Sequence, residues 1–174
     1  LMFTKINYNN LNAKAKEIIS DVDMSGEQSW RETEVAGLYN DLAGFYQSIA
    51  NYDAAGENYK KALAKISFST NAQLYNNTAF NYVSLLQASG NFDEAERVLN
   101  EIESTLQSSD PALQFIFLQN AGSLYHSKGN LAQAETLYDK ALKLAVSTYG
   151  ENSNQYADIL LRKASLLKDK GEYE

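Results

Sequence analysis

The chain repeats one pattern three times, and this internal repeat limits the fold more than any other feature of the sequence. The stretches 41–55, 81–95 and 120–134 align without gaps, at spacings of 40 and then 39 residues. Each continues into a second amphipathic run, in which Tyr59, Leu99 and Tyr138 share one offset. A period of this length is typical of arrays that stack copies of one supersecondary unit. We therefore expect a row of similar units and not one irregular core.

Each repeat is predicted to be a pair of helices joined by a tight turn. The turns carry a small residue followed by asparagine, at Ala50-Asn51, Gly90-Asn91 and Gly129-Asn130. Glycine ends a helix at low cost in the left-handed conformation, and asparagine caps the helix that follows. The first helices have start signals of their own at Ser29, Thr70 and Asp110, the last followed by Pro111.

Small residues recur where the two helices of a pair should meet. One offset of the first helix holds Ala43, Val83 and Gly122, and one offset of the second holds Ala55, Ala95 and Ala134. Small side chains let helix backbones approach closely. A large residue at Ala95 or Gly122 should overpack the pair, at a cost of about 1–3 kcal/mol.

These offsets of small, aromatic and glycine residues resemble the tetratricopeptide repeat over nearly the whole chain. The segment 140–164 resembles the longer, 42-residue repeat of kinesin light chains and of many bacterial signalling proteins. In that repeat the linker runs Gly-x-x-His-Pro-x-x-Ala; here Ser153-Asn154 replaces His-Pro, while Gly129 and Gly171 keep the spacing of 42. The resemblance implies an all-α, right-handed superhelical solenoid of antiparallel helix pairs, with about seven helices.

The predicted organisation is a single array with a partial repeat at each end. Residues 1–28 fit a second helix alone, and residues 153–174 fit a first helix alone. Three complete repeats lie between them: 29–69, 70–109 and 110–152. The cut repeats, together with Leu1 in place of a starting methionine, lead us to expect a fragment of a longer protein.

Composition and charge argue against several classes of function. The 174 residues carry a net charge of -7 and include no cysteine and one histidine. An acidic chain lacks the lysine and arginine excess that binds nucleic acid, and no apolar run approaches the about 20 residues that span a membrane. No phosphate-binding glycine loop or metal-ligand cluster is recognisable, so we expect no cofactor. The absence of a secretory signal makes the cytoplasm the default location.

A catalytic role would rest on His126, because it is the only imidazole in the chain. Such a role needs a nucleophile with an orienting acid, or further metal ligands, and none is recognisable in the sequence. We therefore predict that the chain is not an enzyme, with a catalytic His126 as the remote alternative.

The positions that should carry function are those of the first helices that line the concave side of a stacked array. At spacings of three and four they carry mostly amides and small polar groups, with Phe80 as an apolar contact or as filling between repeats. The predicted groove residues are Asn40, Gln47, Asn77, Phe80, Asn81, Ser84, Gln87, Gln119, Asn120, Ser123, His126 and Arg162.

Amides in such a groove suit the backbone of a peptide, since a carboxamide both donates and accepts hydrogen bonds. Asn81 and Asn120 share one offset and resemble the asparagines with which several tetratricopeptide grooves hold a peptide backbone; Asp41 stands at that offset in the first repeat. The groove positions of the three complete repeats carry no lysine or arginine, which argues against the clamp that grips acidic chaperone tails.

We predict a scaffold module that binds a segment of a protein or peptide partner. Three alternatives stay open: a peptide-sensing regulatory domain that controls an attached effector, self-association through the unfinished ends, and a polar face that is merely solvated.

Overall fold

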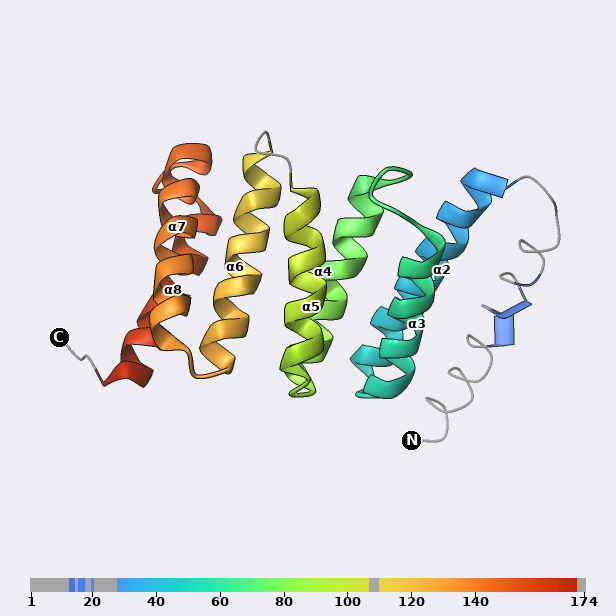
Figure 1. Ribbon diagram of the computed structural model, residues 1–174, viewed down its shortest axis with the longest axis horizontal. Coiled ribbons are helices and arrows are strands. Elements are labelled where there is room, and N and C mark those ends of the chain that lie inside the picture. Colours follow the sequence, from blue (N-terminus) through green and yellow to red (C-terminus); the bar gives the residue numbers. More distant parts are fainter. Residues whose placement is uncertain (1–12, 15, 18–19, 21–27, 107–109, 172–174) are drawn as a thin grey trace. The chain divides into compact units, whose positions relative to one another are not determined.

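The computed structural model describes residues 13–14, 16–17, 20, 28–106 and 110–171. The described part of the chain contains seven helices longer than two residues and no strand, which confirms the all-α expectation (Figure 1). The helices are α2 (Gln28–Ser48), α3 (Tyr52–Lys65), α4 (Ala72–Ala88), α5 (Phe92–Thr105), α6 (Pro111–Ser127), α7 (Leu131–Tyr149) and α8 (Asn154–Lys170). The second helix predicted for residues 1–28 falls almost entirely outside the described residues.

The helices are grouped into two compact units, Leu1–Leu85 and Leu86–Glu174. The first unit contains the α2–α3 pair and most of α4. In the second unit α6 packs against α5 and α7, and α7 packs in turn against α8 (Figure 1). Short turns join α2 to α3 and α6 to α7, so each of these pairs is antiparallel, as predicted.

The turns have the left-handed residue that the sequence predicted, and in one turn this residue is an alanine. Gly90 and Gly129 have φ of 73° and 77°, and Ala50, which stands at the same place, has φ of 58°. The side chains of Asn51 and Asn130 then accept hydrogen bonds from the backbone N–H of Ala54 and Gln133, so both cap their helices as predicted.

Two predicted helix starts are wrong, and one predicted cap lacks its side-chain hydrogen bond. Helix α2 begins at Gln28, one residue before Ser29, and the cap of α4 is Asn71 instead of Thr70. The side chain of Asn71 accepts from the N–H of Leu74 at 2.9 Å, whereas the Thr70 hydroxyl is engaged in the preceding turn. Asn91 makes no side-chain cap. The sequence pattern does not show which of two adjacent cap formers the preceding turn will occupy.

Replacement of Ala50 by glycine is expected to stabilise the protein by up to about 1 kcal/mol. A residue with a Cβ atom is strained in the left-handed region, whereas glycine is not. Ala50 is exposed, so the loss of its methyl group removes little packing. Chemical denaturation followed by circular dichroism measures the change, and Ala88→Gly, at an exposed position within α4, should destabilise instead.

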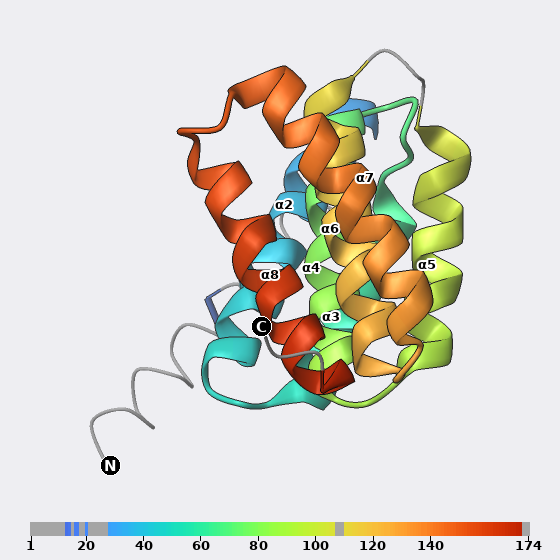
Figure 2. The same cartoon turned by 90° about the vertical axis from the view of Figure 1, so that its left-hand side faces the viewer.

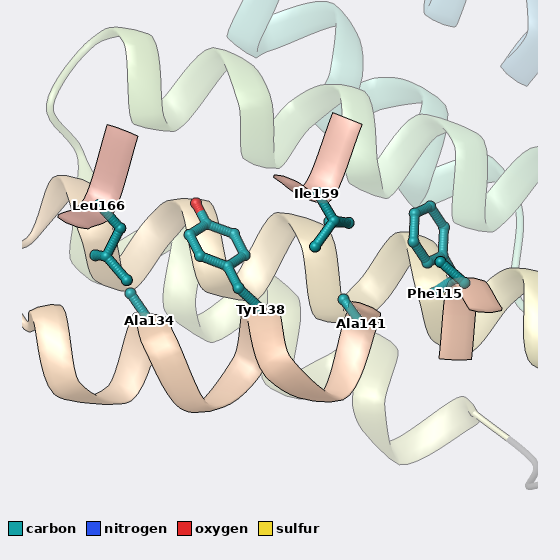
Figure 3. Packing of buried hydrophobic residues seen from close by; sticks show 7 residues of the cluster. Phe115, Ala134, Tyr138, Ala141, Ile159 and Leu166 are labelled. Carbon is teal, nitrogen blue, oxygen red and sulfur yellow. The ribbon is translucent and has the colours of Figure 1, made fainter. Parts of the chain in front are cut away.

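The helices of each unit meet at the predicted small residues. Ala43, Ala55, Ala95 and Ala134 are all fully buried. In the first unit Ala36, Ala62 and Ile66 form a core cluster. In the second unit the ring of Tyr138 lies between Leu166 and Ile159, and the three side chains cover the small residues of α7 (Figure 3). Close helix approach at alanine and glycine therefore makes room for one large side chain of the second helix, Tyr59, Leu99 or Tyr138, in each pair.

Candidate functional site

The first unit presents three asparagines, Asn40 on α2 and Asn77 and Asn81 on α4, which we call the first amide face. The Asn81 Nδ2 atom donates to Asn40 Oδ1 at 3.4 Å, and Asn40 Nδ2 donates to Asp41 Oδ1 at 3.4 Å. Hydrogen bonds of this length are weak. Asn77 and Asn81 are exposed. The carboxamides of this face can therefore exchange their present contacts for those of a ligand at little cost.

Two other predicted groove residues of the first unit, Gln47 and Ser84, make hydrogen bonds within that unit. The Gln47 Oε1 atom accepts a hydrogen bond from the Tyr59 hydroxyl at 3.0 Å, and burial raises the pKa of this tyrosine. The Ser84 hydroxyl donates to the carbonyl of Phe80 at 3.1 Å. Gln47 thus binds a side chain of its own unit, and Ser84 binds a backbone carbonyl of its own helix.

Phe80 does not offer the apolar contact that was predicted for a ligand. Its side chain is only 7% exposed, and its neighbours Ala79 and Thr78 are also buried. Helix α4 is thus covered on several sides, and an aromatic ring gains more free energy from burial than from exposure to water. Of its two predicted roles, the structure supports Phe80 as packing.

The second unit presents Gln87, Gln119, Asn120 and Ser123, which we call the second amide face. Gln87 Nε2 donates to the backbone carbonyl of Asn120 at 3.2 Å, and Asn120 Nδ2 donates to the carbonyl of Ile116 at 2.8 Å. Within the described part of the chain, the Asn120 Oδ1 atom accepts no hydrogen bond. Asn120 therefore offers an acceptor for a peptide N–H, while its donor is already used.

A charged pair from α8 borders the second amide face. The Asp158 carboxylate accepts a hydrogen bond from Gln119 Nε2 and another from Arg162 Nε, the latter at 3.0 Å. Arg162, predicted as a groove residue, is thus neutralised within the protein. The adjacent Tyr138 is buried, which raises the pKa of its hydroxyl; Arg162 and Ser123 act in the opposite direction and do not cancel this effect.

His126 lies at the end of the same face and is held by an acidic residue of α8. Its Nε2 atom is 2.8 Å from Asp169 Oδ2, and its ring packs edge-on against Tyr138, with the ring centroids 6.4 Å apart. The side chain is 17% exposed. His126 thus joins α6 to α8, and its contacts with Asp169 and the ring of Tyr138 hold the imidazole in place.

The sequence did not single out Asp169 or the Tyr138 hydroxyl as neighbours of the candidate site. Residue pairs 39 to 43 positions apart make its contacts between helices: Asn40 with Asn81, Gln119 with Asp158, and His126 with Asp169. These separations equal about one repeat. The repeat period could thus have indicated these neighbours, although not which atoms pair.

A cluster of metal ligands and a membrane-spanning helix are both absent from the described residues. No group of three or more histidine, aspartate or glutamate residues among them could hold a metal ion. No helix in the described ranges is both long enough and apolar enough to cross a bilayer.

The comparisons with known proteins identify the fold. Residues 114–174 match a family model described as the tetratricopeptide repeat. Among solved structures, BtubC (BKLC) from P. vanneervenii is similar, with a TM-score of 0.78 and 17% identity, over 97% of this chain and 68% of that chain. No curated protein matches the sequence. The predicted resemblance to tetratricopeptide repeats is therefore confirmed, by the family model in the C-terminal part and by the fold over nearly the whole chain.

Proposed function

We propose that the chain is a protein interaction module and that each of its two amide faces binds backbone groups of a protein or peptide partner. The coarse part of this function follows from the fold, since tetratricopeptide repeats generally mediate interactions between proteins. The observation that supports the finer part is that Asn77, Asn81 and Asn120 keep hydrogen-bonding capacity that the protein itself does not use.

The two faces differ in the hydrogen bonds that they can offer to a ligand. Asn77 makes no side-chain hydrogen bond among the described residues, and Asn81 makes one long one, so both can donate and accept. Asn120 can only accept, because its donor is bound to Ile116. An extended peptide exposes both N–H and C=O groups, which matches this set without requiring particular side chains.

The expected affinity for one partner segment is modest. Exposed amides bind in competition with water, and each hydrogen bond contributes only about 0.5–1.5 kcal/mol. A dissociation constant in the micromolar range, near -8 kcal/mol, is the order of magnitude expected. His126 has no catalytic part in this proposal, because Asp169 and Tyr138 already hold it in place.

The test compares a double variant of the amide faces with a matched control. We expect Asn81→Ala/Asn120→Ala to lose a partner that the unaltered chain captures from the source organism's lysate, and to bind that purified partner about 10-fold more weakly or worse. The control is Thr136→Ala/Ser147→Ala, which truncates two exposed polar side chains of α7, outside both faces. All variants are first matched by circular dichroism and melting temperature.

Equal binding by the amide variant and the control would contradict the proposal and place recognition elsewhere on the surface. If the captured partner is a short signalling peptide that changes the activity of a longer form of the protein, the regulatory alternative is favoured over the scaffold.

A further inference from the structure

A pocket of about 110 Å³ opens in the second unit and is lined by residues of α5, α6 and α7. The ribbons of these three helices are neighbours in Figure 2. It lies on the opposite side of α6 from the second amide face, because Phe117, Ala121 and Leu124 line it while Gln119 and Asn120 point elsewhere. Each residue of a helix is rotated by about 100° around the helix axis from the one before it, so neighbouring residues in the sequence can lie on different sides of the helix. The pocket is therefore independent of the proposed peptide-binding faces.

The inner wall of this pocket is apolar. Leu99 of α5 and Ala121 and Leu124 of α6 are at most 4% exposed, and Leu137 of α7 completes the wall. Such a surface suits methylene groups or a ring, and burying them releases water. The volume suits one side chain of a partner, not a folded element.

The rim of the pocket is acidic and polar. Glu96 and Glu103 of α5 stand there with the amides of Asn100 and Gln133, and no lysine or arginine is among the lining residues. The Glu103 carboxylate has no ion pair or side-chain hydrogen bond within the part of the chain that the structure describes. An exposed carboxylate beside an apolar wall is a binding partner for a cation at the end of an aliphatic chain.

Glu96 is held as a carboxylate at the other edge of the pocket. Lys128 Nζ donates to it, and the Tyr125 hydroxyl donates to it at 2.7 Å. These two hydrogen bonds lower the pKa of Glu96, and the same carboxylate raises the pKa of Tyr125. The Tyr125 ring, which also lines the pocket, is thereby fixed in position.

The wider surface around the pocket carries negative charge. Helix α5 contains five acidic residues and one arginine, and this Arg97 binds Glu94 and Glu101. A negative field of this kind attracts cationic ligands and repels a second copy of a chain whose own net charge is -7.

We propose that this pocket binds an arginine or lysine side chain from a basic segment of a protein partner. The aliphatic stem lies on Leu99, Leu124 and Leu137, and the cationic head meets Glu103. An arginine also meets the aromatic side chain of Tyr125 in the lining of the same pocket. The site is distinct from the amide faces and adds a second point of contact for a partner.

The test uses two blocked tripeptides, acetyl-Ala-Arg-Ala-amide and the same peptide with norleucine in place of arginine. Titrations are followed by nuclear magnetic resonance of the leucine methyl groups, at low salt. We expect saturable shifts of Leu99, Leu124 and Leu137 with the arginine peptide, with a dissociation constant on the order of 1 mM, and no saturation with norleucine.

Two variants of equal charge test the role of the rim. Glu103→Gln should weaken binding of the arginine peptide about fivefold, the upper end for a partly exposed ion pair. Glu101→Gln changes the net charge equally on the same helix, outside the pocket, and should weaken binding less than about twofold. The Asn81→Ala/Asn120→Ala variant should bind the arginine peptide as tightly as the unaltered chain does. The proposal for this pocket is thus tested separately from the proposal for the amide faces.

Four results would overturn the inference. Equal weakening by both glutamate variants would indicate only a general attraction to the acidic surface. Equal binding of the norleucine peptide, or no methyl shifts at about 10 mM arginine peptide, would remove the basic side chain as the occupant. A dimer in sedimentation that Glu103→Gln dissociates would assign the pocket to a second copy of the chain.

Discussion

Replacement of Gly122 by alanine is expected to lower the free energy of unfolding by about 3 kcal/mol, the upper end for overpacking a core. A Cβ atom at Gly122 would lie 2.5 and 2.7 Å from two ring carbons of Tyr138. These distances are far below the van der Waals contact of carbon atoms, so the ring or the helix must move. The ring has little freedom, because Tyr138 is 1% exposed and lies between Ile159 and Leu166 (Figure 3).

Thermal and chemical denaturation measure this change, with an expected fall in melting temperature of about 6–12 °C for a chain of this size. The matched control is Gly37→Ala in the middle of α2, where an added Cβ has no neighbour within 4 Å. Alanine is the better helix former by about 1 kcal/mol, so the control should stabilise. If both variants changed stability alike, helix propensity would explain the results and the clash with Tyr138 would be ruled out.

A double-mutant cycle separates the clash from other effects at Gly122. Tyr138→Leu alone loses ring packing, yet it also removes the atoms that a Cβ at Gly122 would meet. We expect Gly122→Ala to cost much less in the Tyr138→Leu background, with a coupling free energy above about 1 kcal/mol. Additive losses would place the strain in the α6 backbone instead.

The sequence predicted that a larger residue at Gly122 would overpack the helix pair, because this position belongs to the repeat, but it did not identify Tyr138 as the neighbour. Gly122 and Tyr138 belong to a pattern that occurs three times. The position of Gly122 carries a smaller residue in every repeat, and the position of Tyr138 carries a large one. The same logic predicted the helix pairs and the buried alanines. A periodic pattern reports which face of each helix is buried, since burial imposes the same demand on every repeat.

Features that arise once per chain could not be predicted in this way. The burial of Phe80 and the pocket beside Leu124 depend on how individual side chains fill the space between helices. The pairing of His126 with Asp169 depends on the conformations of a half-buried and an exposed side chain from different repeats. The amide positions were predicted from helix spacing, but their hydrogen bonds were not. In the described part of the chain Gln119 is bound to Asp158, whereas the Asn77 side chain makes no hydrogen bond.

Replacement of Leu166 by alanine should also cost about 3 kcal/mol, through a cavity and not through a clash. Leu166 is fully buried in the core of the second unit, where it lies above Ala134 (Figure 3). The small side chain of Ala134 cannot refill the space. Leu161, on the same helix, is 71% exposed, so Leu161→Ala should change stability by less than about 0.5 kcal/mol.

The Leu166→Ala and Gly122→Ala variants should differ in which helices unfold locally. Helix α8 packs against α7 and has few contacts with α6, whereas α6 has packed helices on both sides. A repeat array transmits stability mainly between neighbours. Hydrogen exchange of the Leu166→Ala variant should therefore accelerate in α8 by up to about 100-fold while α5 stays protected, whereas Gly122→Ala should accelerate α6 and α7 together. Equal acceleration throughout the second unit in both variants would mean that its helices unfold as one cooperative block, and that the repeats of this unit do not act as separate units of stability.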